Sequence, residues 1–191
     1  MAPEIVVVGA STGGLKALQV LLSGLPAEFT LPMVMVQHRG KDMETGLCEF
    51  LASTSRLPVT EPEDKETVLP GRAYLAPRDY HLLIEGGGFA LSTDAPVGFA
   101  RPSIDVLFES VADEYHDRAI GVILTGANQD GARGLAAIKA QGGVAMVEDP
   151  FTAACREMPD AAINLTKVDW ILPLQEMAAG LHKLSINNRT I

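Results

Sequence analysis

The sequence lacks the features that mark membrane, secreted and zinc-binding proteins. No apolar run approaches the roughly 18 residues of a membrane-spanning helix, and Glu4 stands where a secretory leader would carry basic residues. The chain has only two cysteines, Cys48 and Cys155, and none of its four histidines stands at a zinc-ligand spacing from them. We therefore expect a soluble, cytoplasmic protein with no membrane insertion, no structural disulfide and no bound metal.

Positive charge is also scarce. The 191 residues include 15 lysines and arginines against 24 aspartates and glutamates, which gives a formal net charge of -9 at pH 7. Nonspecific affinity for nucleic acid depends on lysine and arginine contacts to phosphates, so this balance disfavours it. We expect no nucleic-acid partner.

The apolar content is enough for one substantial core. Hydrophobic residues make up 47% of the chain, and no repeat or low-complexity segment divides it. We expect one domain over residues 1–184 and a frayed polar tail over residues 185–191.

Short runs rich in Val, Ile and Leu alternate with amphipathic stretches along the chain. This alternation favours a doubly wound α/β fold, in which helices flank both faces of a mostly parallel sheet. The predicted strands cover residues 5–8, 33–37, 59–61, 119–124, 143–147 and 170–172. The predicted helices cover residues 15–22, 45–53, 103–114, 132–141 and 174–184, with Ser103 as the cap of the third.

One region follows a different pattern. Between residues 73 and 92, two alternating segments are separated by Gly86-Gly87-Gly88. This arrangement predicts an antiparallel hairpin at one edge of the sheet.

Polar residues follow three of the predicted strands. Ser11 comes after the first strand within a glycine-rich turn, His38 after the second, and Asp130 in the loop after residues 119–124. Loops at the carboxyl ends of parallel strands converge on one crevice, so these three residues are expected to meet there. A serine hydroxyl needs a neutral imidazole to accept its proton, and the imidazole needs a carboxylate to fix its tautomer. The pattern therefore predicts a Ser-His-Asp triad.

Each of these residues also has a plainer interpretation. A glycine-rich first turn is also how a nucleotide-binding fold holds phosphate, although that fingerprint needs glycine in place of Ser11 and an acid where Gln37 and His38 end the second strand. His38 alone would more often be structural, and Asp130 suits the N-cap of the helix that begins near residue 132.

Three segments around the predicted triad follow a pattern known from one enzyme family. The first carries Ser11 in Val-Val-Val-Gly-Ala-Ser-Thr-Gly-Gly, the second is Gln37-His38, and the third is Ile-Leu-Thr-Gly followed by Asp130-Gly131-Ala132. Further matches in the same order are Leu69-Pro70-Gly71, Ala76-Pro77, Arg101-Pro102-Ser103-Ile104-Asp105-Val106-Leu107-Phe108, Met158-Pro159 and Leu172-Pro173-Leu174. Together these segments resemble the chemotaxis protein-glutamate methylesterases, the CheB family, and the resemblance spans nearly the whole chain.

The resemblance implies a hydrolase that removes methyl esters from glutamyl side chains on the cytoplasmic helices of chemoreceptors. In many members the enzyme also deamidates glutamines there. It assigns the triad to Ser11, His38 and Asp130 in a methylesterase catalytic domain over residues 1–184, and it implies no metal or organic cofactor. Beside it, loop position suggests the amide of Ala127, together with the hydroxyl or amide of Thr12, for an oxyanion. Arg39 and Arg101, with Arg78, would frame a basic mouth for acidic substrate helices.

The sequence departs from the family pattern next to the predicted site. Ala127-Asn128-Gln129 stands where the family usually reads Met-Gly and one further residue, and Asp160 stands where a basic residue commonly follows Met-Pro. The family usually carries a receiver domain ahead of the esterase domain, whereas this chain opens directly into its first strand, so no receiver domain is expected in it. A regulatory or binding module on the same fold, without esterase activity, is the competing hypothesis.

Overall fold

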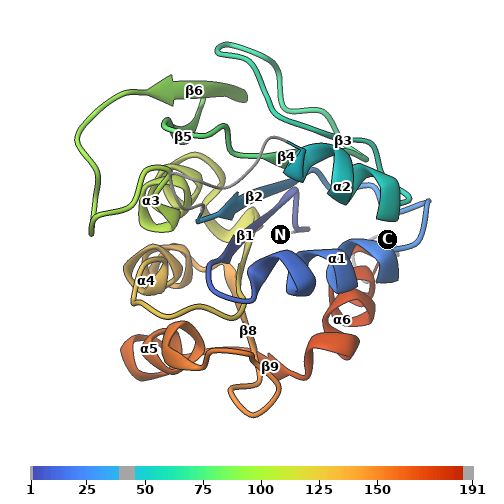
Figure 1. Ribbon diagram of the computed structural model, residues 1–191, viewed down its shortest axis with the longest axis vertical. Coiled ribbons are helices and arrows are strands. Elements are labelled where there is room, and N and C mark those ends of the chain that lie inside the picture. Colours follow the sequence, from blue (N-terminus) through green and yellow to red (C-terminus); the bar gives the residue numbers. More distant parts are fainter. Residues whose placement is uncertain (1, 39–45, 187–191) are drawn as a thin grey trace.

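A seven-stranded parallel sheet lies between two layers of helices in the computed structural model, which describes residues 2–38 and 46–186 (Figure 1). All neighbouring strands of this sheet run parallel. In sheet order the strands are β3 (Val59–Thr60), β4 (Ala73–Leu75), β2 (Met33–Gln37), β1 (Ile5–Ala10), β7 (Ala119–Ile123), β8 (Val144–Glu148) and β9 (Trp170–Leu172). The α/β fold with a mostly parallel sheet is confirmed.

The helices divide between the two faces of the sheet. One face is covered by α1 (Gly14–Gly24), α2 (Leu47–Thr54) and α6 (Leu174–Ile186). The other is covered by α3 (Ile104–Tyr115), α4 (Ala132–Ala140) and α5 (Glu157–Leu165), with a 3-10 turn at His116–Arg118 after α3. No helix among the described residues is long and apolar enough to cross a membrane.

Strand β1 shows why the sequence pattern predicted this sheet. Val6 and Val8 belong to the core on the α1 face, whereas Ile5 and Val7 belong to the core on the α3 face. All four side chains are fully buried. A strand that is buried on both sides needs apolar residues at every position, which produces a continuous apolar run.

The hairpin is also confirmed, and it forms a sheet of its own. Strands β5 (His81–Glu85) and β6 (Gly88–Ser92) pair antiparallel and pack beside α3. The rings of Tyr74 in β4 and Phe89 in β6 lie 4.6 Å apart between centroids, which joins the hairpin to the main sheet by side-chain packing.

Two elements differ from the sequence predictions. Ala73–Leu75, assigned above to the hairpin region, is instead β4 of the parallel sheet, because its short and fully buried run fits between β3 and β2. Helix α5 was missed. Pro159 occupies its first helical turn, where an amide hydrogen has no helical partner in any case. A third, smaller difference is that the last helix ends at Ile186 rather than residue 184, and residues 187–191 of the predicted tail lie outside the described residues.

The sheet order places a crevice at the carboxyl end of β1. From β1 the chain continues to the neighbouring strand β2, then to the edge strand β3 and back to β4, which lies between them, and it later returns to the other side of β1 at β7. The loops after β1, β2 and β7 therefore open onto the same rim, where open α/β sheets bind their ligands.

Candidate functional site

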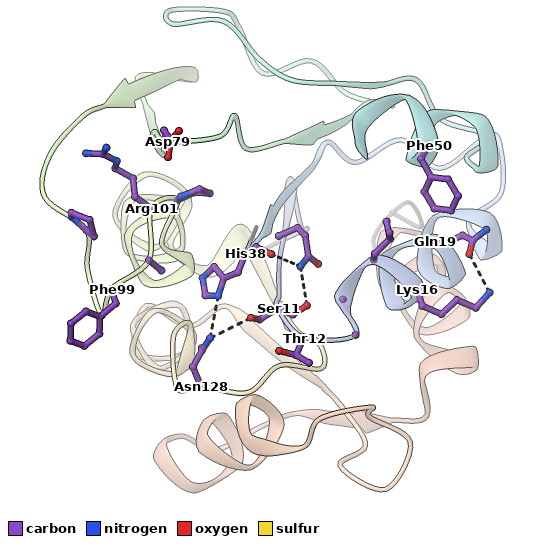
Figure 2. Close-up of a pocket in the computed structure, with 18 residues that line it drawn as sticks. Ser11, Thr12, Lys16, Gln19, His38, Phe50, Asp79, Phe99, Arg101 and Asn128 are labelled. Atoms are coloured by element: carbon purple, nitrogen blue, oxygen red, sulfur yellow. Dashed lines mark hydrogen bonds between the residues drawn. The ribbon is translucent and has the colours of Figure 1, made fainter. Parts of the chain in front are cut away.

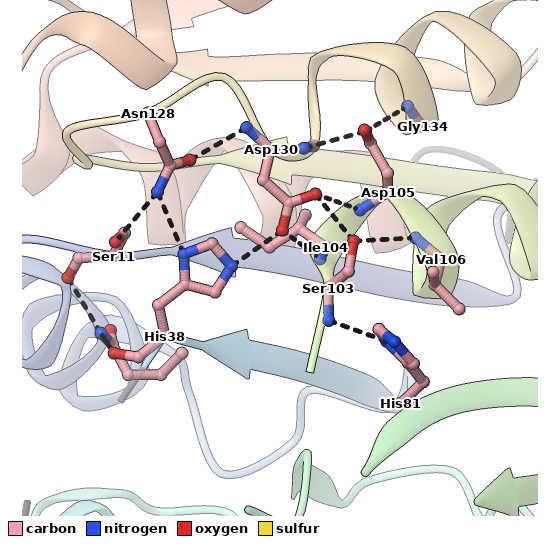
Figure 3. A network of polar contacts seen from close by, with 12 residues as sticks. Ser11, His38, His81, Ser103, Ile104, Asp105, Val106, Asn128, Asp130 and Gly134 are labelled. Carbon is pink, nitrogen blue, oxygen red and sulfur yellow. Dashed lines mark hydrogen bonds and ion pairs between the residues drawn. The ribbon is translucent and has the colours of Figure 1, made fainter. Parts of the chain in front are cut away.

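His38 and Asp130 form a close pair at this rim (Figure 3). His38 directly follows β2, and its backbone N–H donates to the Ala10 carbonyl at 3.0 Å. Its ring Nε2 lies 2.8 Å from Asp130 Oδ2. A carboxylate only accepts hydrogen bonds, so Nε2 carries the proton and Nδ1 presents its lone pair. The aspartate therefore fixes the imidazole tautomer in which Nδ1 is the base.

The Asp130 carboxylate lies at the N-terminus of α3. It accepts backbone hydrogen bonds from Ile104 at 2.7 Å and Asp105 at 3.0 Å, and a hydroxyl hydrogen bond from Ser103 at 2.8 Å. Burial by itself would raise the pKa of Asp130, but the hydrogen bond with His38 and those from the Asp105 and Ile104 amides outweigh it, so the pKa is lowered. The site thus holds a carboxylate anion beside the imidazole.

Asp105 makes the reciprocal contact at the N-terminus of α4. It accepts hydrogen bonds from the backbone of Gly131 at 2.9 Å and Gly134 at 2.8 Å, and from Arg133 Nε at 3.0 Å. The alternative that Asp130 caps α4 is therefore wrong. Asp130 accepts hydrogen bonds from the N-terminus of α3, and Asp105 accepts those from the N-terminus of α4. Ser103 caps α3 as predicted, accepting from Val106 at 3.5 Å.

Ser11 stands in the turn between β1 and α1. Its N–H donates to the Thr125 carbonyl at 3.0 Å, and its carbonyl accepts from Gly14 at 2.8 Å. Glycine is required at two places in this turn: Gly13 has φ of 80°, and a Cβ at Gly14 would lie 2.1 Å from Gln37 Oε1. The turn therefore cannot accept larger residues without moving Ser11.

Gln37 joins the serine turn to the histidine loop. Its buried Nε2 donates to the Ser11 carbonyl at 2.9 Å and to the His38 carbonyl at 2.8 Å. In the sequence, Gln37 stood only as an argument against nucleotide binding and as part of the Gln37-His38 family segment, with no role of its own. A polar residue immediately before His38, at the end of a buried strand, was the feature of the sequence that could have indicated this bridging role.

Asn128 lies between Ser11 and His38 (Figures 2 and 3). Its Nδ2 lies 3.4 Å from Ser11 Oγ and 3.2 Å from His38 Nδ1, while its Oδ1 accepts the Asp130 backbone N–H at 2.9 Å. Within the described part of the chain, no hydrogen bond joins Ser11 Oγ directly to His38. The structure brings the three predicted residues together and adds a fourth that the sequence identified only as a departure from a pattern.

Glu148 supports the serine turn from behind. It is almost fully buried at the end of β8, and its Oε2 accepts the Thr125 backbone N–H at 2.9 Å. Burial raises the pKa of Glu148, against the opposing effect of hydrogen bonds from Thr125 and Thr152. The Thr125 carbonyl in turn accepts the Ser11 N–H, so Thr125 alone connects Glu148 to the backbone of Ser11.

The two proposed oxyanion donors are available for hydrogen bonding. Thr12 and Ala127 are exposed on either side of Ser11, and their backbone N–H groups have no acceptor within residues 2–38 and 46–186. Thr12 lines the cavity that contains Ser11, whereas Ala127 is not among its lining residues. The loop positions are therefore compatible with a donor role, more directly for Thr12.

A cavity of about 1050 Å³ opens over the serine (Figure 2). Ser11, His38 and Asn128 line it, together with outer residues that include Lys16, Phe50, Phe99 and Arg101. The described residues contain no group of three or more His, Cys, Asp or Glu side chains that could hold a metal ion.

The predicted arginines have different positions. Arg101 lines the cavity, and its Nη1 donates to the carbonyls of Thr93 at 2.9 Å and Asp94 at 3.0 Å. Arg78 is exposed and lies 3.5 Å from Asp79 without lining the cavity. Arg39 lies outside the described residues.

Comparison with known proteins agrees with this geometry. The family model of the CheB methylesterase matches residues 6–181. A Leptospira interrogans protein, provisionally named a protein-glutamate methylesterase/protein-glutamine glutaminase, is 45% identical over 97% of this chain and 96% of its own length. An Anaeromyxobacter dehalogenans protein-glutamate methylesterase/protein-glutamine glutaminase is 42% identical over 95% of this chain, which spans only 53% of that relative.

The solved structure of the Thermotoga maritima CheB methylesterase catalytic domain superposes with a TM-score of 0.90 and 36% identity, covering 96% of this chain and all of that one. Sequence and structure therefore match the same family over almost the whole chain. The chain belongs to the CheB methylesterase family.

Proposed function

We propose that this protein hydrolyses the methyl esters of glutamyl side chains on the cytoplasmic helices of chemoreceptors, with Ser11, His38 and Asp130 as its catalytic triad. The observation that carries the proposal is the 2.8 Å pair of His38 Nε2 and Asp130 Oδ2 beside Ser11. Membership of the CheB methylesterase family and the names of the relatives support the substrate. These substrates would place the enzyme in the cytoplasm.

The proposed reaction is acyl transfer in two steps. His38 Nδ1 takes the Ser11 proton as Oγ attacks the ester carbonyl, and the imidazolium then gives that proton to the departing methoxy group, which leaves as methanol. In the second step His38 removes a proton from water as the water oxygen attacks the acyl-serine, and the imidazolium then gives that proton to the departing Ser11 Oγ, which releases the glutamate side chain and restores the serine hydroxyl and the neutral imidazole.

Asp130 and the backbone amides stabilise the charges that develop. Asp130 keeps the proton on Nε2 and stabilises the imidazolium, because its lowered pKa keeps it anionic. The Thr12 amide, with that of Ala127, would stabilise the tetrahedral oxyanion. Lys16 and Arg101, which line the cavity, would supply positive charge for acidic substrate helices.

The same chemistry would serve glutamine deamidation. A glutamine side chain presents the same acyl group with ammonia in place of methanol as the leaving group. The relatives carry both activities in their names. Ammonia release from unmethylated receptor, measured beside methanol release, separates the two reactions.

A regulatory module without esterase activity is the second candidate, and one observation favours it. Ser11 Oγ has no direct hydrogen bond to His38, since Asn128 contacts both. Methanol release from receptor carrying radiolabelled methyl esters decides between the candidates. The enzyme should release methanol and be labelled at Ser11 by a serine-directed phosphonate. Release by wild type and Ser11→Ala at equal rates, or by neither, would contradict the triad.

A further inference from the structure

The proposed reaction does not explain the contact that Asn128 makes. His38 Nδ1 has one lone pair, and in the reaction this lone pair must accept the Ser11 hydroxyl proton. In the structure the Asn128 amide nitrogen lies 3.2 Å from Nδ1 and 3.4 Å from Ser11 Oγ. An amide hydrogen therefore occupies the position that the hydroxyl hydrogen must take before the serine can react.

The neighbours of Asn128 fix the orientation of its amide. Its Oδ1 accepts the Asp130 backbone N–H at 2.9 Å. A flipped amide would place its NH2 against that N–H, donor facing donor, and its oxygen against the lone pair of His38 Nδ1. The nitrogen therefore faces the serine and the histidine. Asn128 is not among the residues with positive φ, so its backbone accepts alanine as readily as asparagine.

We infer that Asn128 is a positioning residue that keeps Ser11 and His38 uncoupled in the resting site, and that substrate binding displaces its amide. This inference rests on the triad proposed above. Both contacts are long for hydrogen bonds, so each is weak and a bound ester can replace them. Once the amide moves, the Ser11 hydroxyl can donate to Nδ1, and reactive serine appears only when a substrate fills the cavity.

Labelling of Ser11 by a small uncharged phosphonate tests the inference without a receptor. Asn128→Ala and Asn128→Gly should be labelled about three to ten times faster than wild type, the change expected from removing one weak competing hydrogen bond. Gln129→Ala is the matched control, because Gln129 is an exposed residue of the same loop that does not line the Ser11 cavity. Its labelling rate should equal that of wild type, and thermal unfolding should show that all variants fold.

Two results would overturn the inference. An unchanged rate in the Asn128 variants would make the amide a bystander, and a loss of about a hundredfold or more would make it an oxyanion donor. The ¹⁵N resonance of His38 Nδ1 gives an independent measure, since it should move in Asn128→Ala but not in Gln129→Ala. If no protein is labelled, wild type included, the triad proposal fails, and an Nδ1 resonance that does not move then rejects the contact as well.

A separate observation concerns Phe99 at the mouth of the cavity. Val97 and Ala100 exchange both backbone hydrogen bonds, at 3.0 and 2.9 Å, across a two-residue turn of Gly98 and Phe99. Both turn residues have positive φ, 56° and 67°, a conformation that glycine and asparagine accept far better than phenylalanine. The Phe99 side chain is fully exposed. A tight turn therefore presents a large apolar group to solvent at a conformational cost.

The position of the Phe99 side chain indicates which binding partner would contact it. Phe99 lines the Ser11 cavity and also a neighbouring cavity of about 750 Å³ that extends past Asn128 to Leu165 (Figure 2 shows Phe99 at the rim). A protein segment that presents an ester to Ser11 would therefore lie against this part of the rim. Phe151 is also strongly exposed, at 88%, but lines neither cavity.

The geometry points to Phe99 as an apolar anchor for the protein substrate, the amphipathic receptor helix that carries the esterified glutamate. This second inference also depends on the proposed substrate. Burying a phenylalanine side chain corresponds to roughly a ten- to hundredfold gain in affinity. A small phosphonate that enters the cavity alone would not gain from it.

Binding of a methylated receptor fragment to a Ser11→Ala background measures this without turnover. Adding Phe99→Gly should raise the dissociation constant about tenfold or more, whereas adding Phe151→Ala should leave it unchanged. Phe99→Gly in the wild-type background should keep the phosphonate labelling rate and should not lower thermal stability, because glycine suits the turn. Equal affinity with and without Phe99 would overturn the anchor, and so would a parallel loss of labelling. If the phosphonate labels Ser11 in wild type but the Ser11→Ala protein binds no fragment, the proposed substrate and the anchor role of Phe99 are both wrong. The triad proposal is then still supported.

Discussion

The two halves of the site differ in how tightly they are held. On the Asp130 side, the carboxylate is held by His38, two backbone amides and a hydroxyl, all within 3.0 Å. On the serine side, the hydrogen bond of Ser11 Oγ within the described residues is the 3.4 Å contact with Asn128. The base and its carboxylate are therefore preorganised, whereas the nucleophile is coupled to them only after a rearrangement.

The reason lies in the elements that supply each half. Asp130 and Asp105 each accept from the N-terminus of the other's helix, so α3 and α4 lock the carboxylate in place. The Ser11 backbone is also held, through Thr125 and Gln37, but its hydroxyl is not. Because Asp130 is held rigidly while the Ser11 hydroxyl is not, substrate binding can control the step that couples Ser11 to His38.

Removing the nucleophile should give the largest effect. Ser11→Ala should lower kcat for methanol release by about a million-fold, because loss of a triad nucleophile removes covalent catalysis. The backbone contacts of residue 11 remain, so the fold and receptor binding should not change. Rates from methanol release and affinities from titration check both parts, and appreciable turnover would rule out an acyl-serine.

The second-largest effect is expected from removing the carboxylate on the Asp130 side of the site. Asp130→Asn should lower kcat by about 10⁴-fold, since an amide cannot hold the imidazole in the tautomer with a free Nδ1. It should also change the pH dependence of stability. The folded pKa of Asp130 is lowered, so its stabilisation is present above the unfolded pKa of about 4 and is lost as pH falls through the folded value. Urea unfolding should show the gap between wild type and Asp130→Asn shrinking at acid pH, and a gap that is constant with pH would contradict this.

A smaller effect is expected from the reciprocal contact. Asp105→Ala leaves the buried amides of Gly131 and Gly134 without their acceptor, which should lower the free energy of unfolding by about 1–3 kcal/mol. It should also lower kcat, because the loop that carries Asp130 is then less well held. Arg133→Ala is the control: it removes only the exposed partner of Asp105 and should cost little. Denaturant unfolding and kcat measure both variants, and equal losses in the two would locate the effect in the ion pair instead.

The smallest effect is expected behind the serine turn. The pKa of Glu148 is raised, so its carboxyl stabilises the fold while protonated, and that stabilisation is lost as pH rises through the folded pKa. Glu148→Gln cannot ionise, so its stability relative to wild type should increase as pH rises from the unfolded pKa of about 4.5 to the folded pKa, by about 1.4 kcal/mol for each unit of pKa difference. Thermal unfolding across this range measures the trend. A difference that does not depend on pH would mean that Glu148 does not titrate there.

Much of this arrangement could be predicted from residue pattern. The strand that ends before Ser11 and the strand that ends before His38 are continuous apolar runs, and continuous runs indicate strands that are buried on both faces of a parallel sheet. Elements without such a signal were missed or misassigned. The three residues of β4 are too few for a period, and α5, which has Pro159 in its first turn, was not predicted.

The sequence by itself determined that Ser11, His38 and Asp130 share one rim, because each follows a strand of a parallel sheet whose carboxyl ends lie together. Only the tertiary structure decided what each of them contacts there. The exchange of caps between Asp105 and Asp130 requires α3 and α4 to pack with their N-termini side by side, and the place of the Asn128 amide requires the loops after β1, β2 and β7 at fixed separations. Such contacts join residues far apart in the chain, and no local pattern encodes them.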